Sequence, residues 1–324
     1  MIIKYVKWLS VIVILFSLGV FLYNSDIQAI AHNVTLVGFN FCYLILVTFI
    51  AQIFGTLSWR STLPQNMQVS FKDLFLIRFI GEHIGLINPA NFVGGDAFKA
   101  YELEKRGVDY KEGISSLVVA RTIMIYVQVG VYIVAALIYL YFILNEASLL
   151  IKSILISIGF ILISLAVFIG SSRFFESRLL KNKGLVKSIN SVRSAIKSYY
   201  QNQGGRLFMS IFWAVINFLV GAIEMWLICH FIGVNITYLE ALVIDQGVLF
   251  FKSFAAFIPG QIGVEEYTNK IMLVIVGISS MSVWISVSIL RRARQIFWIL
   301  LGVLTYYFLM PKENLSRNTY TIKS

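Results

Sequence analysis

The stretch Asn88–Tyr101 reads NPANFVGGDAFKAY, and it interrupts a chain dominated by long apolar runs. Pro89 has no amide hydrogen and cannot continue a helix. Gly94 and Gly95 allow a left-handed backbone and close approach of another chain segment. Backbone groups at membrane depth must be satisfied by the protein, so a broken segment there lines a cavity or is buried. We interpret the stretch as a re-entrant element that forms a polar site. A plain cytoplasmic loop is the alternative.

Charged residues on both sides of this break favour the re-entrant interpretation. Asp96 and Lys99 are three residues apart and share one face if a helix restarts there. Upstream, the apolar segment Phe71–Ile87 carries Arg78 and Glu82, which are four residues apart and also share a face. This segment is the first arm of a hairpin in one interpretation and an interfacial amphipathic helix in the other.

The composition indicates a polytopic α-helical membrane protein. Of 324 residues, 58% are hydrophobic and 13% are charged, which is too apolar for a soluble domain of this size. The net charge of +11 comes from Lys and Arg clustered in loops, so it indicates topology and anionic lipid rather than nucleic acid. The two cysteines and three histidines show no metal-binding spacing. We expect an all-α protein of the cell membrane with no metal and no cofactor.

Seven apolar segments are candidates for membrane spans, although the first is short against the ~20 residues that a span needs. They are Trp8–Tyr23, Leu36–Trp59, Gly113–Leu144, Leu149–Gly170, Leu207–Ile232, Tyr267–Leu290 and Gln295–Met310. Two broken hairpins, each followed by a span, complete the predicted fold.

We expect residues 1–324 to form a single integral membrane domain in two halves. A first half, 1–170, and a second half, 207–310, flank the connector Ser171–Arg206, and a polar tail covers 311–324. The connector holds eight basic residues against one acidic residue, which predicts a cytoplasmic location. The same rule predicts a cytoplasmic N-terminus and a cytoplasmic turn at Arg291–Arg294. The connector is also a possible docking surface for a glycosyltransferase or a lipid-modifying enzyme, and the sequence leaves open a homo-oligomer.

A second broken tip lies late in the chain, in the segment FIPGQIGVEEY. Pro259, Gly260 and Gly263 interrupt the apolar pattern, and Glu265 and Glu266 follow at once. Because proline and glycine break helices here as they do in the first half, we predict a second re-entrant hairpin.

The two tips fall into register when their prolines are aligned. Seven residues before them stand Glu82 and Lys252, and seven residues after them stand Asp96 and Glu266. The predicted topology runs the two halves in opposite directions, which is the inverted repeat of many transporters. Two lone charges at its centre would be costly. We therefore predict a direct or water-bridged contact between Glu82 and Lys252.

Arg121 lies well inside the predicted span Gly113–Leu144, where an arginine is costly unless it is paired or hydrated. Snorkelling to the nearby membrane surface is the structural alternative. Arg291 and Arg292 occupy a comparable place after the second tip. Together, NPANFVGGDAFKAYEL, FIPGQIGVEEY and these arginines resemble the lysylphosphatidylglycerol synthase transmembrane, or flippase-like, family over nearly the whole chain. Lys99 stands where that family usually has arginine, and Ala120 where an acidic residue often precedes Arg121.

The resemblance implies a membrane domain that moves or binds phospholipids or lipid-linked glycoconjugates. The part after Met310 is too short for the family's synthase domain, so we expect no enzyme activity. In the flippase hypothesis, both hairpins meet at one central cleft whose cations hold an anionic headgroup. The cleft residues would be Glu82, Asp96, Lys99, Arg121, Lys252, Glu265, Glu266, Arg291 and Arg292.

The most specific prediction is that Lys99, Arg121 and one of Arg291 or Arg292 converge on the headgroup. Pro89 and Pro259 then mark the hairpin tips that gate this site. One alternative is a proton-coupled transporter of a small solute that uses Asp96 or Glu266 as a proton relay. Another is a membrane scaffold for a glycosyltransferase. A structural role, in which these charges only hold the bundle together, also remains open.

Overall fold

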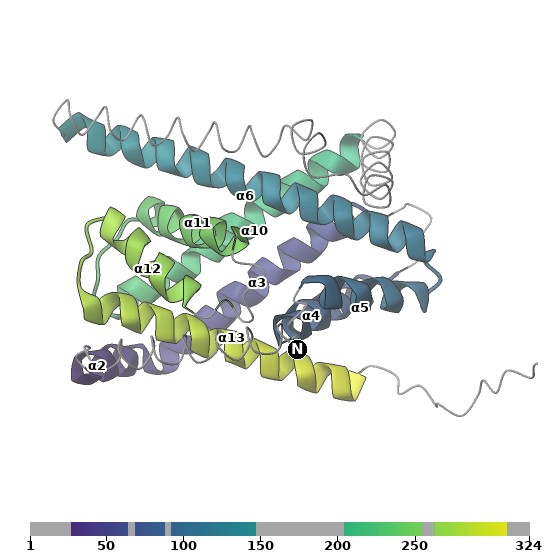
Figure 1. Ribbon diagram of the computed structural model, residues 1–324, viewed down its shortest axis with the longest axis horizontal. Coiled ribbons are helices and arrows are strands. Elements are labelled where there is room, and N and C mark those ends of the chain that lie inside the picture. Colours follow the sequence, from purple (N-terminus) through teal and green to yellow (C-terminus); the bar gives the residue numbers. More distant parts are fainter. Residues whose placement is uncertain are drawn as a thin grey trace, which may run out of the picture.

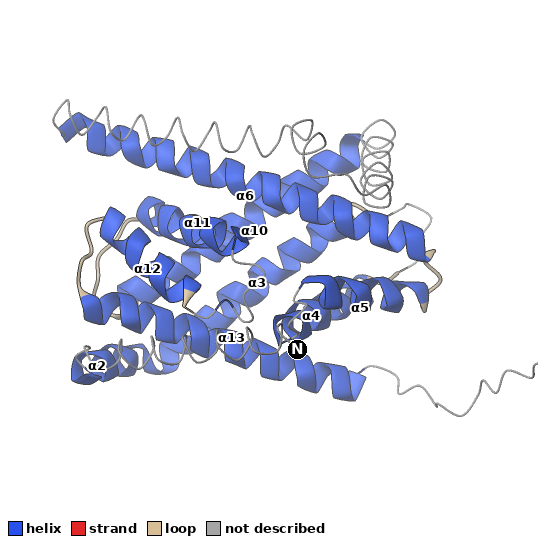
Figure 2. Cartoon of the chain, viewed as in Figure 1, coloured by secondary structure: helices blue, strands red, loops and turns tan. Residues whose placement is uncertain are grey.

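The computed structural model describes residues 27–63, 69–87, 92–146, 204–254, 261 and 263–309. This part of the chain is helical, with short turns and no strand (Figure 2). Several predictions concern residues outside it: the spans at 8–23 and 149–170, nearly all of the basic connector, and the tip residues Pro89, Pro259 and Gly260.

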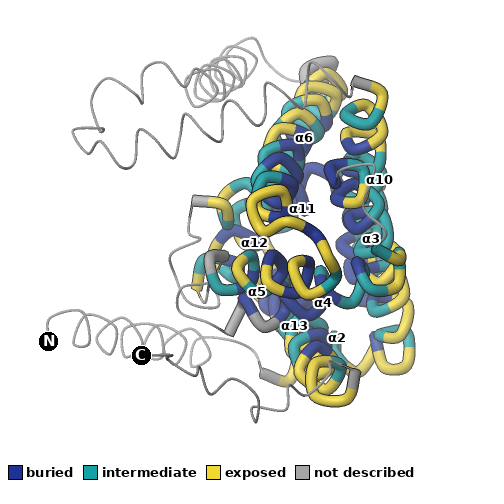
Figure 3. The backbone as a smooth tube through the Cα atoms, turned by 90° about the vertical axis from the view of Figure 1, so that its right-hand side faces the viewer, coloured by how far each residue is buried: buried dark blue, intermediate teal, exposed yellow. Residues whose placement is uncertain are grey.

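Three helical stretches in the described part are long and apolar enough to cross a membrane, which confirms a membrane protein. Ala31–Arg60 combines most of α2 (Ile27–Val37), the 3-10 turn η1 (Gly38–Asn40) and α3 (Phe41–Arg60). The others lie in α6 (Tyr110–Glu146) and α10 (Gly204–Phe231). They match the spans predicted at 36–59, 113–144 and 207–232. Their outward sides remain exposed while the inward sides are buried (Figure 3), as expected for helices surrounded by lipid.

α3 and α10 run antiparallel at the centre, between α6 on one side and α13 (Met281–Leu309) on the other (Figure 1). Ser58 contacts Ser210 near one end, and the Tyr43 ring lies 6.3 Å from the Phe231 ring near the other. Ser58 Oγ donates to the Ser210 carbonyl at 2.9 Å, and Ser210 Oγ donates back to Ser58 at 3.0 Å. Small residues that exchange hydrogen bonds allow such close helix packing in membranes.

α4 (Phe71–Ile87) and α5 (Phe92–Glu104) form the predicted first hairpin, but its break is shorter than expected. Gly94 and Gly95 lie inside α5, and neither has a positive φ. A Cβ on Gly95 would collide with the carbonyl oxygen of Gly81 on α4. The close approach of another chain segment that these glycines predicted is therefore confirmed at Gly95, whereas neither glycine uses a left-handed backbone.

The second half repeats this order, with α11 (Tyr238–Phe254) and α12 (Val264–Ile275) between the long helices α10 and α13. Each hairpin has a first helix of 17 residues, followed by one of 13 residues in the first hairpin and 12 in the second. Gly263, with φ of 85°, precedes α12, and its amide donates to Glu266 Oε2 at 2.7 Å. The inverted relation of the halves stays a prediction.

α13 corrects the predicted topology of the last third of the chain. Arg291–Arg294 lies within this continuous 29-residue helix and forms no turn. The chain turns earlier, at 276–280, where Gly277 has φ of 89°. The separate spans predicted at 267–290 and 295–310 are therefore wrong. Arg291 and Arg294 pair with the buried side chains of Asp245 and Glu224, so this run of positive charge did not indicate a loop.

Candidate functional site

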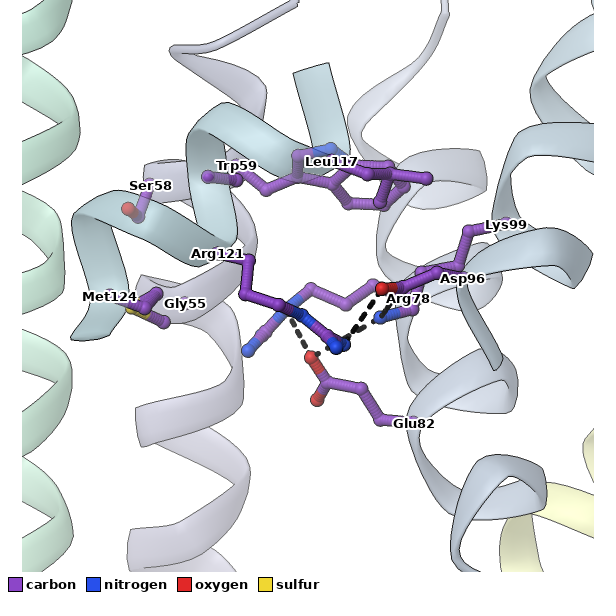
Figure 4. A pocket seen from close by; sticks show the side chains of 11 residues that line it. Gly55, Ser58, Trp59, Arg78, Glu82, Asp96, Lys99, Leu117, Arg121 and Met124 are labelled. Atoms are coloured by element: carbon purple, nitrogen blue, oxygen red, sulfur yellow. Dashed lines mark hydrogen bonds and ion pairs between the residues drawn. The ribbon is translucent and has the colours of Figure 1, made fainter. Parts of the chain in front are cut away.

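A cavity of about 200 Å³ opens between α3, α4, α5 and α6, and we call it the polar pocket. Figure 4 shows charged side chains from three of these helices turned toward one another within it. Its lining consists of Gly55, Ser58, Trp59, Arg78, Glu82, Asp96, Lys99, Leu117, Ala120, Arg121 and Met124. Four predicted site residues, Glu82, Asp96, Lys99 and Arg121, therefore meet in one place.

A continuous chain of ion pairs joins the five charged residues of the polar pocket. Arg78 Nε lies 2.9 Å from Glu82 Oε1, and Lys99 Nζ lies 3.7 Å from the same oxygen. Lys99 Nζ is also 3.3 Å from Asp96 Oδ1, while Arg121 Nη2 is 2.8 Å from Asp96 Oδ2. Because three cations face two carboxylates, the lining carries one net positive charge. Contacts of this length between charged groups are stronger than neutral hydrogen bonds.

Helical spacing and small residues place these side chains. Arg78 and Glu82 are one turn apart on α4, as predicted. Arg78 also donates to the Gln52 carbonyl at 2.8 Å, and its guanidinium fills the space that a Cβ on Gly55 would occupy. The Lys99 side chain similarly fills the space that a Cβ on Gly81 would occupy. Sequence reasoning noted Arg78 but did not assign it to the site, and it missed the two glycines because their role depends on a neighbouring helix.

Exposure differs sharply within the polar pocket. The side chains of Arg78 and Lys99 are 11% and 7% exposed, whereas those of Glu82 and Arg121 are 36% and 39% exposed. Arg78 and Lys99 therefore lie deeper in the pocket than the carboxylates of Glu82 and Asp96. Arg121 reaches the open side, where an incoming anion would meet it first.

A second group of charges lies between α11, α12 and α13, and its centre is Glu265. The side chain of Glu265 is 2% exposed and lies 2.7 Å from Lys252 Nζ. Arg291 Nε and Arg292 Nη1 approach the same carboxylate at 3.4 Å and 3.8 Å. Three cations thus surround one buried acid.

Two more acids complete this group, which we call the buried network: Asp245, Lys252, Glu265, Glu266, Arg291 and Arg292. Arg291 Nη2 donates to Asp245 Oδ1 at 2.7 Å, and Arg292 Nε donates to Glu266 Oε1 at 2.7 Å. Three cations therefore face three carboxylates. One turn further along α13, Arg294 Nε lies 2.7 Å from Glu224 of α10. Sequence reasoning did not assign Asp245 to the site, since its partner lies on a distant helix.

The predicted single cleft is therefore divided into two charge groups. Glu82 pairs with Arg78 and Lys99, and Lys252 pairs with Glu265. No ion pair in the described part joins Glu82 to Lys252, so a direct contact between them is wrong, and a water-bridged contact stays a prediction.

The cations predicted to converge on a headgroup lie in two separate places. Lys99 and Arg121 meet at Asp96, whereas Arg291 and Arg292 belong to the buried network. The difference arises because α13 stays helical through its arginines and carries them to the acids of α11 and α12. Within the described residues, no three His, Cys, Asp or Glu side chains are grouped to hold a metal.

Comparison with known proteins gives one family. The family model described as the lysylphosphatidylglycerol synthase TM region matches residues 7–302, which cover both hairpins and both charge groups. No curated protein and no solved structure matched the chain. With an all-helical fold, spans of membrane length and a family match over most of its length, the chain belongs to the lysylphosphatidylglycerol synthase transmembrane family.

Proposed function

We propose that this integral membrane protein binds lipids with an anionic headgroup in the polar pocket and moves them between leaflets. The observation that carries the proposal is the open, net-positive lining, in which Arg121 is 39% exposed beside a cavity of about 200 Å³. Arginine suits this task because its guanidinium donates two parallel hydrogen bonds to a phosphate. Lys99 and Arg78 supply further positive charge from behind.

The level of Arg121 along α6 also supports a headgroup site. The next 24 residues, Thr122–Asn145, contain no Asp, Glu, Lys or Arg. In a helix they span about 36 Å, slightly more than the ~30 Å of a bilayer's hydrocarbon core. This run alone is long enough to cross the hydrocarbon core, which would set Arg121 near the level of the lipid phosphates rather than deep inside the predicted span 113–144.

The finer assignments are part of the same proposal. The membrane is the cell membrane, the N-terminus is cytoplasmic, and the substrate is a phospholipid or a lipid-linked glycoconjugate. Binding and movement need no covalent step, so we propose a carrier rather than an enzyme. A partner glycosyltransferase or lipid-modifying enzyme would use or supply the transported lipid.

A flippase assay on the purified protein tests the proposal. Vesicles would contain fluorescent phosphatidylglycerol or fluorescent phosphatidylcholine, and a membrane-impermeant quencher would report movement. Loss of a charged hydrogen bond corresponds to about 10- to 100-fold in affinity. We therefore expect Arg121→Gln to slow movement and weaken binding of phosphatidylglycerol by that factor.

Arg106→Gln provides a matched control. Arg106 pairs with Glu102 at 2.7 Å on α5 and the turn that follows it, but it does not line the polar pocket. We expect this variant to retain wild-type movement. A folded Arg121→Gln protein with full phosphatidylglycerol binding and movement would refute the proposal.

A proton-coupled transporter is a second candidate, and the buried network favours it. Carboxylates inside membrane proteins often act in proton relays, and Glu265 and Asp245 are nearly fully buried there. A solute transporter would acidify vesicles when substrate is added and would not depend on lipid headgroup charge. Headgroup-dependent lipid movement without proton flux excludes it.

A further inference from the structure

We infer that the polar pocket continues into an apolar groove that holds one acyl chain, so that both form a single lipid site. This inference rests on the proposed function and adds a second contact to it. The groove has a volume of about 530 Å³ and lies between α6, α10 and α11. Its lining is entirely apolar and includes Ile211, Val215 and Leu219 of α10. We call it the α6–α10 groove.

The first argument is that pocket and groove share one face of α6. Positions separated alternately by three and four residues lie along one side of a helix. On α6, such a row begins in the polar pocket and ends in the groove: Leu117, Ala120, Met124, Val127, Val131, Val134 and Ile138. A molecule that follows this face therefore passes from the charged lining to the apolar one.

A second junction lies on the opposite wall. Ser58 lines the polar pocket and exchanges two hydrogen bonds with Ser210 of α10. Ile211, the next residue, lines the groove. The α3 wall of the pocket therefore contacts α10 one residue before the groove lining begins on that helix.

The dimensions match a lipid. From Val127 to Ile138 the groove extends about 16 Å along the helix, which is close to half of the ~30 Å hydrocarbon core. Arg121 precedes Val127 by six residues, or about 9 Å. The order along α6 is therefore a cation at headgroup depth and then an apolar channel one leaflet long, which is the order of a lipid.

A second apolar groove, between α3, α4 and α13, provides a comparison. It has a volume of about 420 Å³ and is lined by aromatic residues that include Phe75, Phe79 and Trp298. The helix α4 separates it from the polar pocket, since Arg78 and Glu82 line the pocket while Phe75 and Phe79 line this groove. Lipid there would be ordinary surrounding lipid, without contact to the cations.

Photo-crosslinking tests the inference. The full-length protein would be placed in phosphatidylcholine vesicles with a small fraction of phosphatidylglycerol that carries a diazirine on one acyl chain. Labelled peptides would be identified by mass spectrometry. We expect labelling of the α6–α10 groove to exceed labelling of the second groove and to fall about tenfold in Arg121→Gln.

Gly130→Leu blocks the groove directly. Gly130 lines it, and a Cβ there meets nothing within 4 Å, so the larger side chain enters open space without a clash. Displacing about two methylene groups of the chain weakens binding about tenfold. Leu301→Phe, which fills the second groove, is the control and should leave phosphatidylglycerol binding unchanged. Val134→Phe is a second variant that blocks the groove. Thermal unfolding of each variant separates a blocked groove from a misfolded protein.

The outcomes distinguish this inference from the proposed function. If Arg121→Gln weakens phosphatidylglycerol binding but both blocking variants bind as the wild type, the headgroup site stands and the groove is overturned. Equal labelling of both grooves that Arg121→Gln does not change also overturns it. If neither Arg121→Gln nor the blocking variants affect binding, the proposed function itself fails.

Discussion

The two charge groups use the same residue types but differ in balance and exposure. In the polar pocket three cations face two carboxylates, and Arg121 is 39% exposed. In the buried network three cations face three carboxylates, and the side chains of Glu265 and Arg291 are 2% and 4% exposed. In a neutral, buried group each charge is already offset by an opposite charge of the same group. An open group with excess positive charge still attracts an anion, so the pocket is the better candidate for binding and the network for holding helices together.

Arg291→Ala should have the largest effect and would test whether the network is structural. The substitution leaves Asp245 without its 2.7 Å partner and weakens the neutralisation of Glu265. Breaking a buried ion pair in this way costs about 3–5 kcal/mol. We expect a large loss of thermal stability and of expressed folded protein, measured by fluorescence-detected size exclusion during a temperature series. A stable Arg291→Ala protein would show that the two groups do not differ as described.

Gly95→Ala should destabilise the hairpin that carries the polar pocket by about 1–3 kcal/mol. The added methyl group collides with the Gly81 carbonyl, and α4 and α5 must separate. Gly130→Ala is the control, because its Cβ enters open space and alanine is a better helix former. Thermal unfolding of both variants measures the difference. Equal stability would contradict the close packing of these helices.

Arg121→Ala should change stability by less than about 1 kcal/mol, because exposed ion pairs contribute little. Its binding of anionic lipid should nevertheless fall strongly, in contrast to Arg291→Ala, which loses the fold first. Unfolding and vesicle binding measured on one preparation separate the two effects. Loss of stability comparable to that of Arg291→Ala would assign Arg121 a structural role.

Asp96→Asn should have the smallest effect and the opposite sign. It removes a carboxylate that competes with the lipid phosphate for Arg121 and Lys99. An additional net positive charge at an open site should raise affinity for phosphatidylglycerol about two- to fivefold, most clearly at low salt. Vesicle flotation at two ionic strengths measures this gain. Weaker binding would mean that Asp96 is needed to position the cations.

Local patterns in the sequence predicted the class of protein and much of the first hairpin. The long apolar runs predicted α3, α6 and α10 because a helix is the simplest way to satisfy backbone groups in lipid. Helical spacing alone placed Arg78 with Glu82 and Asp96 with Lys99. The position of Arg121 inside an apolar run also predicted a polar partner, and Asp96 is that partner.

Only the tertiary structure decided how these pieces combine. Arg291–Arg294 resembled a loop because a run of arginines is costly in lipid, but acids on α10, α11 and α12 neutralise it inside a helix. Gly95 was compatible with a left-handed break or with close approach of another segment, and the position of the Gly81 carbonyl on α4 decides for close approach. In both cases the deciding partner lies on another helix. The free energy of a charge or a glycine depends on that neighbour, which the order of residues along the chain does not reveal.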